Sequence, residues 1–319
     1  MINIFKQHPY RRRLQQAFLL LTSITLITVA QADLWDNVQH GYADNQGTKI
    51  HYTSIGEGPL VVMVHGFPDF WYTWRDQMEA LKDHYKVVAM DQRGYNRSDQ
   101  PEAPEAYDMV HLVSDIAAVI QANQAKQAIV VGHDWGGAVA WQFAFAHPEL
   151  TERLIILNLP HPNGFMRELI TNEEQRKNSA YAQAFKNGSH TDPTIFFSRP
   201  MTPESLAGWV TDESARKRYV AAFTRSSFKG MLEIYKRNYP DLPDPSTPVP
   251  NIDIRIQCPV LVIHGLKDTA LNSNGLNQTW DWIDGNLTLV TIPKAGHFVQ
   301  QDAPAMVSRT MKWWLLAQD

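Results

Sequence analysis

The sequence predicts an α/β fold in which a mostly parallel central sheet is covered by helices on both faces and a helical segment is inserted between two strands. Six short apolar runs are bounded by turn residues. They are continuous rather than alternating, which is typical of strands buried on both faces. Segments of helical periodicity lie between them, and this alternation favours an open α/β sheet. The 319 residues, 44% of them hydrophobic, are enough to build a large core.

The predicted strands and helices follow one another in regular order. We expect strands over residues 59–64, 85–90, 128–131, 154–157, 259–263 and 287–292. We expect helices over 110–122, 138–146 and 305–316. Between about His161 and Asn251 the chain is polar, aromatic and helix-forming, and it ends in a proline-rich connector. We therefore predict an α/β core over 33–160 and 252–319, with a helical cap over 161–251.

The first 32 residues have the layout of a secretory signal peptide. Basic residues at positions 6 and 11–13 precede an apolar run over 17–30, and Ala30-Gln31-Ala32 is a small-x-small cleavage site. The apolar run is shorter than the roughly 20 residues that span a bilayer. We expect export to the periplasm or the medium, with no stable membrane association after cleavage. An uncleaved membrane anchor is the alternative.

Charge and cysteine content exclude several classes of protein. The chain has 29 Lys+Arg and 33 Asp+Glu, a formal net charge of −4. Removal of the four cations in residues 1–32 leaves 25 against 33, a net charge of −8. A chain of this sign has no excess of cations to neutralise a phosphate backbone, so we expect no nucleic-acid partner. The single cysteine, Cys258, excludes a disulfide within the chain and a Cys-rich zinc site.

The strongest local motif is Gly132-His133-Asp134-Trp135-Gly136-Gly137, directly after a predicted buried strand and before a helical segment. Glycines at these positions allow a sharp turn that presents one side chain above the sheet, a nucleophile elbow. The residue at its centre is usually Ser, and here it is Asp134. We predict Asp134 as the nucleophile, against the alternative of a tight turn without chemistry.

Two further candidates follow later strands in the order nucleophile, acid, base. Asp268 follows the strand predicted over 259–263, and His297 follows the last predicted strand. An acid in this place can accept the Nδ1–H of the histidine and stabilise its protonated form. We therefore predict Asp268 and His297 as the acid and base of a catalytic set. A lone histidine is more often structural, but three candidates at three strand ends in this order support one another.

A fourth motif, His65-Gly66-Phe67-Pro68, follows the first predicted strand. A loop at this place can supply one backbone N–H to an oxyanion hole, and the residue after the nucleophile supplies another. We predict the amides of Phe67 and Trp135 as these donors and place His65 and Pro68 in the substrate pocket. The alternative is a simple strand-ending turn.

With these motifs the sequence resembles the α/β-hydrolases, and specifically the epoxide hydrolases of that superfamily. The resemblance runs from about Lys49 to Trp314 and includes the turn Asp91-Gln92-Arg93-Gly94-Tyr95. One departure is Asn96, where family members often have Gly. The resemblance also implies two cap tyrosines that hold the epoxide oxygen. The segments 228–235 and 181–185 are similar to the two tyrosine motifs, which implies Tyr235 and Tyr181, with Tyr219 and Tyr239 as nearby competitors.

An aspartate nucleophile is anionic at neutral pH and suits displacement at a saturated carbon. The resemblance implies hydrolysis of an epoxide to a vicinal diol through an alkyl ester on Asp134, without a metal or organic cofactor. A haloalkane dehalogenase would use the same Asp134, His297 and Asp268 but would hold halide with N–H donors, such as Trp135 and a cap tryptophan like Trp209. An exported binding or effector protein on this scaffold is the third possibility, because fold does not fix function.

Overall fold

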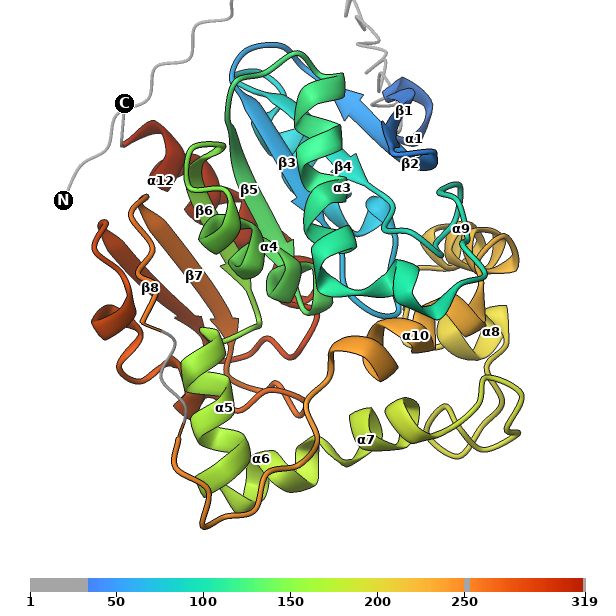
Figure 1. Cartoon of the computed structure of the whole chain (residues 1–319). Helices are drawn as coiled ribbons and strands as arrows, with labels where there is room; N and C mark the ends of the chain where they lie inside the picture. Colours follow the sequence, from blue (N-terminus) through green and yellow to red (C-terminus); the bar gives the residue numbers. More distant parts are fainter. Residues whose placement is uncertain (1–33, 250–252, 318–319) are drawn as a thin grey trace, which may run out of the picture. The chain divides into compact units, whose positions relative to one another are not determined.

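The computed structural model describes residues 34–249 and 253–317, and the predicted signal peptide lies outside them. Eight strands form one sheet in the order β1-β2-β4-β3-β5-β6-β7-β8 (Figure 1). Strands β3 to β8 pair in parallel, while β1 and β2 are antiparallel to their neighbours. The predicted fold class is confirmed.

All six predicted strands are present at or near their expected bounds. They are β3 (Leu60–Val64), β4 (Lys86–Met90), β5 (Ala128–His133), β6 (Thr151–Leu157), β7 (Val260–Gly265) and β8 (Leu287–Ile292). The hairpin of β1 (Gln39–Asn45) and β2 (Thr48–Ile55) was not predicted. Its first strand is largely exposed, so it carries no continuous apolar run. Gln46 and Gly47 turn the hairpin with positive φ angles of 53° and 91°.

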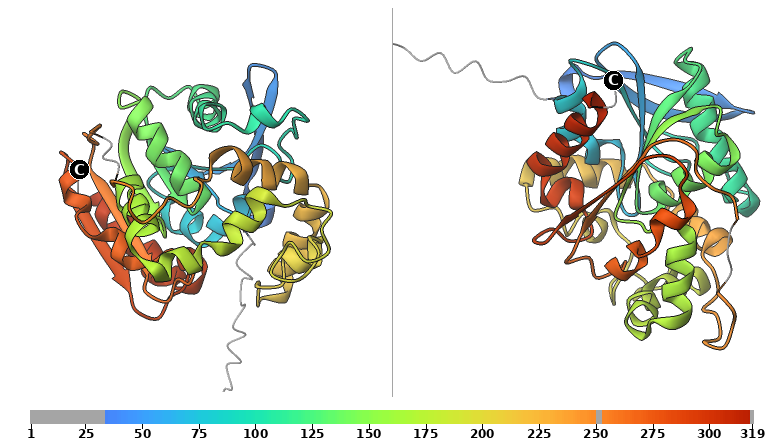
Figure 2. Two further views of the ribbon diagram at one scale, coloured as in Figure 1. Left: turned by 60° about the horizontal axis from the view of Figure 1, so that its bottom comes forward. Right: turned by 90° about the vertical axis from the view of Figure 1, so that its left-hand side faces the viewer.

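Helices cover both faces of the sheet (Figure 2). One face carries α3 (Met109–Ala122) and α4 (Trp135–Ala146), and the other carries α2 (Arg75–Leu81) and α12 (Pro304–Leu316). The shorter elements of the core are α1 (Leu34–Asn37), α11 (Val299–Asp302) and four 3-10 helices, η1 (Trp71–Trp74), η2 (Pro104–Tyr107), η3 (Ser273–Leu276) and η4 (Thr279–Trp282). The three helices predicted from periodicity correspond to α3, α4 and α12.

Six helices lie between β6 and β7 in the described part of the chain. They are α5 (Pro162–Thr171), α6 (Glu173–Asn178), α7 (Ala180–Asn187), α8 (Pro203–Leu206), α9 (Glu213–Thr224) and α10 (Phe228–Asn238). They extend beyond the carboxyl ends of the parallel strands (Figure 1). Within the ranges 34–249 and 253–317, none of the helices is both long and apolar enough to cross a bilayer.

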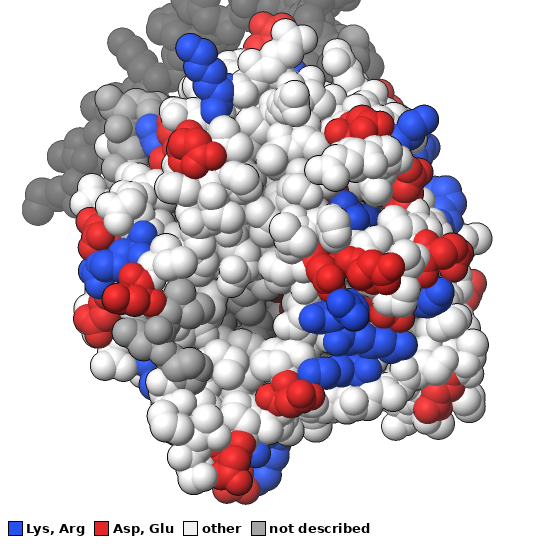
Figure 3. All heavy atoms as spheres, viewed as in Figure 1, with Lys and Arg blue, Asp and Glu red and all other residues white. Residues whose placement is uncertain are grey.

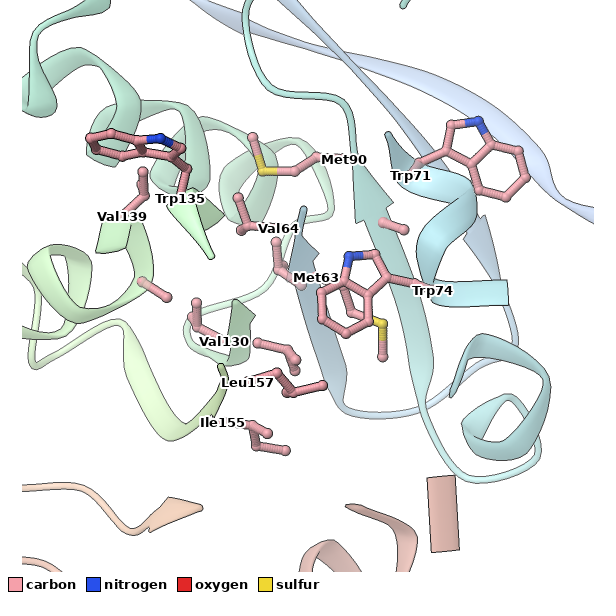
Figure 4. Close-up of a cluster of buried hydrophobic side chains, with 14 of the residues drawn as sticks. Met63, Val64, Trp71, Trp74, Met90, Val130, Trp135, Val139, Ile155 and Leu157 are labelled. Carbon is pink, nitrogen blue, oxygen red and sulfur yellow. The ribbon is translucent and has the colours of Figure 1, made fainter. Parts of the chain in front are cut away.

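The core is built on the central strands. Met63, Val130, Ile155 and Leu157 are fully buried in an apolar cluster that also includes Trp74 and Val139 (Figure 4). This packing fixes the strands, and parallel pairing brings their carboxyl ends to one edge of the sheet. That edge carries the loops after β3, β5, β6, β7 and β8, which contain the candidate residues. Asn96, in the turn that follows β4, has a φ of 46°, a conformation that Asn tolerates and that explains its place in a Gly position.

Candidate active site

Asp134 occupies a sharp turn between β5 and α4. Its φ and ψ are 52° and −123°, a strained conformation for a residue with a side chain. The turn is close-packed, because a Cβ on Gly132 would lie 2.3 Å from the carbonyl oxygen of Gly136, and one on Gly136 would lie 2.1 Å from that of Val64. Gly132 and Gly136 are therefore required by space, and the turn has the form of a nucleophile elbow.

His297 lies between two carboxylates. Its Nδ1–H donates to Oδ2 of Asp268 over 2.9 Å, and its Nε2 lies 3.3 Å from Oδ2 of Asp134. All three side chains are mostly buried, with exposed fractions of 16% for His297, 9% for Asp134 and 1% for Asp268. The three residues predicted from separate motifs thus come together in hydrogen-bonding order.

The charges of this set reinforce one another. Burial alone would lower the pKa of His297, but the charges and hydrogen bonds of Asp268 and Asp134 outweigh burial and raise it well above its usual value. Burial likewise opposes ionisation of both carboxyls, yet His297 holds the pKa of Asp134 and of Asp268 below the ordinary range. The resting site is therefore an imidazolium flanked by two carboxylates.

A backbone amide points at the Asp134 carboxylate. The N–H of Phe67 donates to Oδ1 of Asp134 over 2.8 Å. Trp135 begins α4, where a backbone N–H has no acceptor within the helix. The two amides predicted for an oxyanion hole are therefore both next to Asp134. Phe67 lies in the loop that contacts Asp134, and Trp135 directly follows Asp134 in the chain.

Two cavities adjoin the site. The larger, about 580 Å³, is lined by His297, Pro68, Trp209, Tyr181 and Tyr235 among others. The smaller, about 270 Å³, is lined by Asp134 and Trp135 and by the same two tyrosines. In the space-filling view a hollow opens in this face of the molecule, and charged side chains gather at its rim on the side of α10 (Figure 3). Arg237 on α10 forms an ion pair with Asp108, which follows η2.

Tyr181 and Tyr235 come from α7 and α10, and their rings lie 6.5 Å apart between centroids. Tyr235 also packs edge-on against Trp135, at 5.0 Å. Burial, with the nearby charge of Asp134, raises the pKa of both phenols well above its usual value, so both remain protonated at neutral pH. Of the two competitors, Tyr239 lines the smaller cavity. Tyr219 is instead engaged by Asp69 through a 2.7 Å hydrogen bond.

The expectation that His65 lines the substrate pocket is corrected by the structure. Its side chain is fully buried. Nδ1–H donates to the carbonyl of Gly66 over 2.8 Å, and Nε2 accepts the N–H of Gln92 over 3.0 Å. With both ring nitrogens bound to backbone, His65 braces the loop that carries Phe67. Pro68 lines the larger cavity.

Two buried polar residues near the site were not found from the sequence. Asn158 follows β6 and donates to Asp268 over 2.6 Å. Asp69, two residues after Phe67, is fully buried and bonded to the cap through Tyr219. Neither belongs to a spacing pattern that marks chemistry, although Asn158 does follow a predicted strand end. Residues 34–249 and 253–317 contain no group of three or more His, Cys, Asp or Glu suited to hold a metal ion.

Comparison with known proteins agrees with this geometry. Residues 59–304 match the family model of the α/β hydrolase fold, and the chain belongs to that superfamily. Epoxide hydrolase 1 of Caenorhabditis elegans is 31% identical over 294 residues, covering 88% of this chain and 70% of the relative. Within the superfamily the chain therefore belongs to the epoxide hydrolases.

Solved structures show the same likeness. An epoxide hydrolase of Bacillus megaterium in complex with an inhibitor has a TM-score of 0.76 and 30% identity, covering 86% of this chain and 99% of the other. A variant of a Bacillus megaterium epoxide hydrolase, complexed with its product (R)-3-[1]naphthyloxy-propane-1,2-diol, has a TM-score of 0.75, 30% identity and the same coverage.

Proposed function

We propose that this protein is an epoxide hydrolase that converts an epoxide to a vicinal diol through a covalent ester on Asp134. The observation that carries the proposal is a carboxylate at a nucleophile elbow that lines one cavity with two protonated phenols, Tyr181 and Tyr235. A carboxylate needs no deprotonation to attack, and two phenols can stabilise and protonate the alkoxide that a ring opening releases. The relatives in the epoxide hydrolase family support the same reaction.

The first half-reaction forms the ester. Oδ1 of Asp134 is held by the Phe67 amide, so Oδ2 is the attacking oxygen. Its electron pair forms a bond to one epoxide carbon, and the ring C–O bond at that carbon breaks with its electrons moving to the epoxide oxygen. Tyr181 or Tyr235 donates a proton to that oxygen. The product is a hydroxyalkyl ester of Asp134.

The second half-reaction hydrolyses the ester. Esterification removes the charge of Asp134, one of the two charges that raise the pKa of His297. The pKa of His297 then falls, and its proton returns to the tyrosinate that ring opening left. The neutral imidazole takes a proton from water that attacks the ester carbonyl. The amides of Phe67 and Trp135 stabilise the oxyanion on Oδ1, each worth about 3 kcal/mol in comparable sites. The ester C–O bond breaks, the leaving oxygen takes the proton from His297, and the diol departs. The carboxyl of Asp134 then gives its proton to His297, which restores the ion pair.

The test is a single-turnover reaction of purified protein with a panel of aryl and alkyl epoxides beside matched bromoalkanes. Diol formation, with an adduct on Asp134 that accumulates in His297→Gln by intact mass, would support the proposal. Halide release without epoxide turnover would instead assign a dehalogenase and direct attention to Trp135 and Trp209. Absence of both activities would favour a binding protein on this scaffold.

The leader in residues 1–32 is also part of the proposal. Cleavage after Ala32 would deliver the enzyme to the periplasm or the medium, where it acts on a small-molecule epoxide without a stable membrane attachment. Expression in a bacterial host, fractionation and mass measurement of the N-terminal peptide test this. A peptide beginning at Asp33 in the exported fraction would agree, and full-length chain retained in the membrane would indicate an uncleaved anchor.

A further inference from the structure

Asn158 is a buried residue at the carboxyl end of β6, beside the strands that carry Asp134 and Asp268. Its side chain is fully buried, and its φ of 42° is one that Asn adopts more readily than most residues. Its own N–H donates to the carbonyl of Ile263 over 3.0 Å, which attaches it to β7. The backbone of Asn158 is therefore held against β7, and its side-chain amide points in a defined direction.

That amide group makes three hydrogen bonds, and each goes to a loop of the catalytic set. Nδ2–H donates to Oδ2 of Asp268 over 2.6 Å and to the carbonyl of Gly296, the neighbour of His297, over 3.1 Å. Oδ1 accepts the N–H of Gly265 over 3.0 Å. One side chain thus joins the ends of β6 and β7 to the loop after β8.

Asn158 contacts the same oxygen of Asp268 that orients His297. Oδ2 of Asp268 accepts both from Asn158 and from Nδ1–H of His297. The other oxygen, Oδ1, accepts the backbone amides of Ala270 and Leu271 over 2.7 and 3.0 Å. Four donors therefore saturate the carboxylate, and Asn158 is the donor that prevents Oδ2 from turning away from His297.

We propose that Asn158 is a positioning residue for ester hydrolysis, an inference that rests on the proposed function. Its amide holds the carboxylate of Asp268 and the backbone beside His297 in a fixed relative position. The imidazole is thereby oriented to take a proton from water. Attack by Asp134 on the epoxide uses neither the base nor its acid. Loss of Asn158 should consequently slow the second half-reaction and spare the first.

Only an amide fits these three contacts. A carboxylate has nearly the same shape but cannot donate to Asp268 or to the Gly296 carbonyl. Glycine removes the amide while it tolerates the positive φ, so it separates the hydrogen bonds from the backbone conformation. Asn158→Gly and Asn158→Asp are therefore the two informative variants. If Asn158→Gly folds poorly, Asn158→Asp still tests the inference.

The experiment measures both half-reactions of the full chain by rapid quench and intact mass, with an epoxide that the wild type turns over. We expect the rate of ester formation to stay within about 3-fold of wild type, while ester hydrolysis falls by about 10- to 100-fold in both variants. Gln77→Ala is the control, because Gln77 is an equally buried amide on α2 that bonds Ser308 and the carbonyl of Gln300. It should lower stability without changing the ratio of the two rates.

A second readout follows the His297–Asp268 hydrogen bond itself. The downfield proton signal of Nδ1–H, assigned by its loss in His297→Gln, should shift or broaden in both Asn158 variants and stay unchanged in Gln77→Ala. Equal slowing of both half-reactions, or unchanged hydrolysis, would overturn the inference while leaving the proposed function intact. Wild-type protein that forms neither ester nor diol would contradict the proposed function itself.

Discussion

Nε2 of His297 lies 3.3 Å from Oδ2 of Asp134, so base and nucleophile form an ion pair before substrate binds. The pairing lowers the pKa of Asp134 and raises that of His297. Asp134 is thereby kept ionised, which is the form that attack on the epoxide needs. Ester formation dissolves the pair and returns His297 toward its ordinary pKa.

This pairing predicts different pH profiles for the two half-reactions. Ester formation needs ionised Asp134 and protonated phenols, so its rate should be flat between about pH 6 and 9. Ester hydrolysis needs neutral His297, and its rate should rise with pH until the imidazole of the ester intermediate is fully deprotonated. Quenched single turnovers across this range check both profiles. A hydrolysis rate that falls as pH rises would contradict the assignment of His297 as base.

The cap phenols should act as a pair in ring opening. Tyr181→Phe or Tyr235→Phe should slow ester formation, and the double variant should lose at least about 10²-fold, because the alkoxide then lacks any phenolic proton donor. Tyr107→Phe is the matched control, since the Tyr107 hydroxyl is buried without a hydrogen-bond partner among the described atoms. A double variant with near-normal ester formation would remove both tyrosines from the mechanism.

Gly66 should be essential because of its distance from the nucleophile. A Cβ at this position would lie 2.4 Å from Cβ and 2.5 Å from Oδ1 of Asp134. Gly66→Ala should displace the carboxylate and lower kcat/KM by about 10²-fold or more. Gly47→Ala provides the contrast, because its Cβ would meet no atom within 4 Å and its positive φ strains only the hairpin turn. That variant should lose some stability and keep its activity, measured by thermal unfolding and diol formation.

Asp69 should make stability depend on pH. Burial raises its pKa to about 7, against hydrogen bonds that include that of Tyr219. The folded protein therefore holds a proton that the unfolded chain releases near its ordinary pKa of about 4. The stability from that proton is present below about pH 4 and is lost as the pH rises through about 7.

Asp69→Asn removes this titration. Between about pH 4 and 8 the wild type should lose up to about 4 kcal/mol more unfolding free energy than the variant, at 1.36 kcal/mol per pKa unit. Urea unfolding at both ends of the range measures the difference. Parallel pH dependence in the two proteins would show that Asp69 is ionised in the folded state throughout.

Local patterns were sufficient to predict the parallel part of the sheet and the elbow. A strand buried on both faces must be continuously apolar, and such runs appear as β3 to β7. The sixth run forms β8, an edge strand that is only partly buried. The turn at Asp134 needs glycines because its backbone contacts the carbonyls of Gly136 and Val64, and a requirement of that kind is visible in the sequence. The hairpin of β1 and β2 was missed because β1 is an exposed edge strand and β2 buries polar residues, so neither carries a continuous apolar run.

By itself, the sequence determined the order of buried strands, the turn residues that end them and the chemical types at those ends. The tertiary structure decided how the residues use one another. His65 matched a motif, but both of its ring nitrogens are engaged in hydrogen bonds with the backbone. Asn158 matched none, yet it joins Asp268 to the His297 loop. Hydrogen bonds between residues more than 100 positions apart depend on strand order and register, which arise only when the whole sheet has assembled.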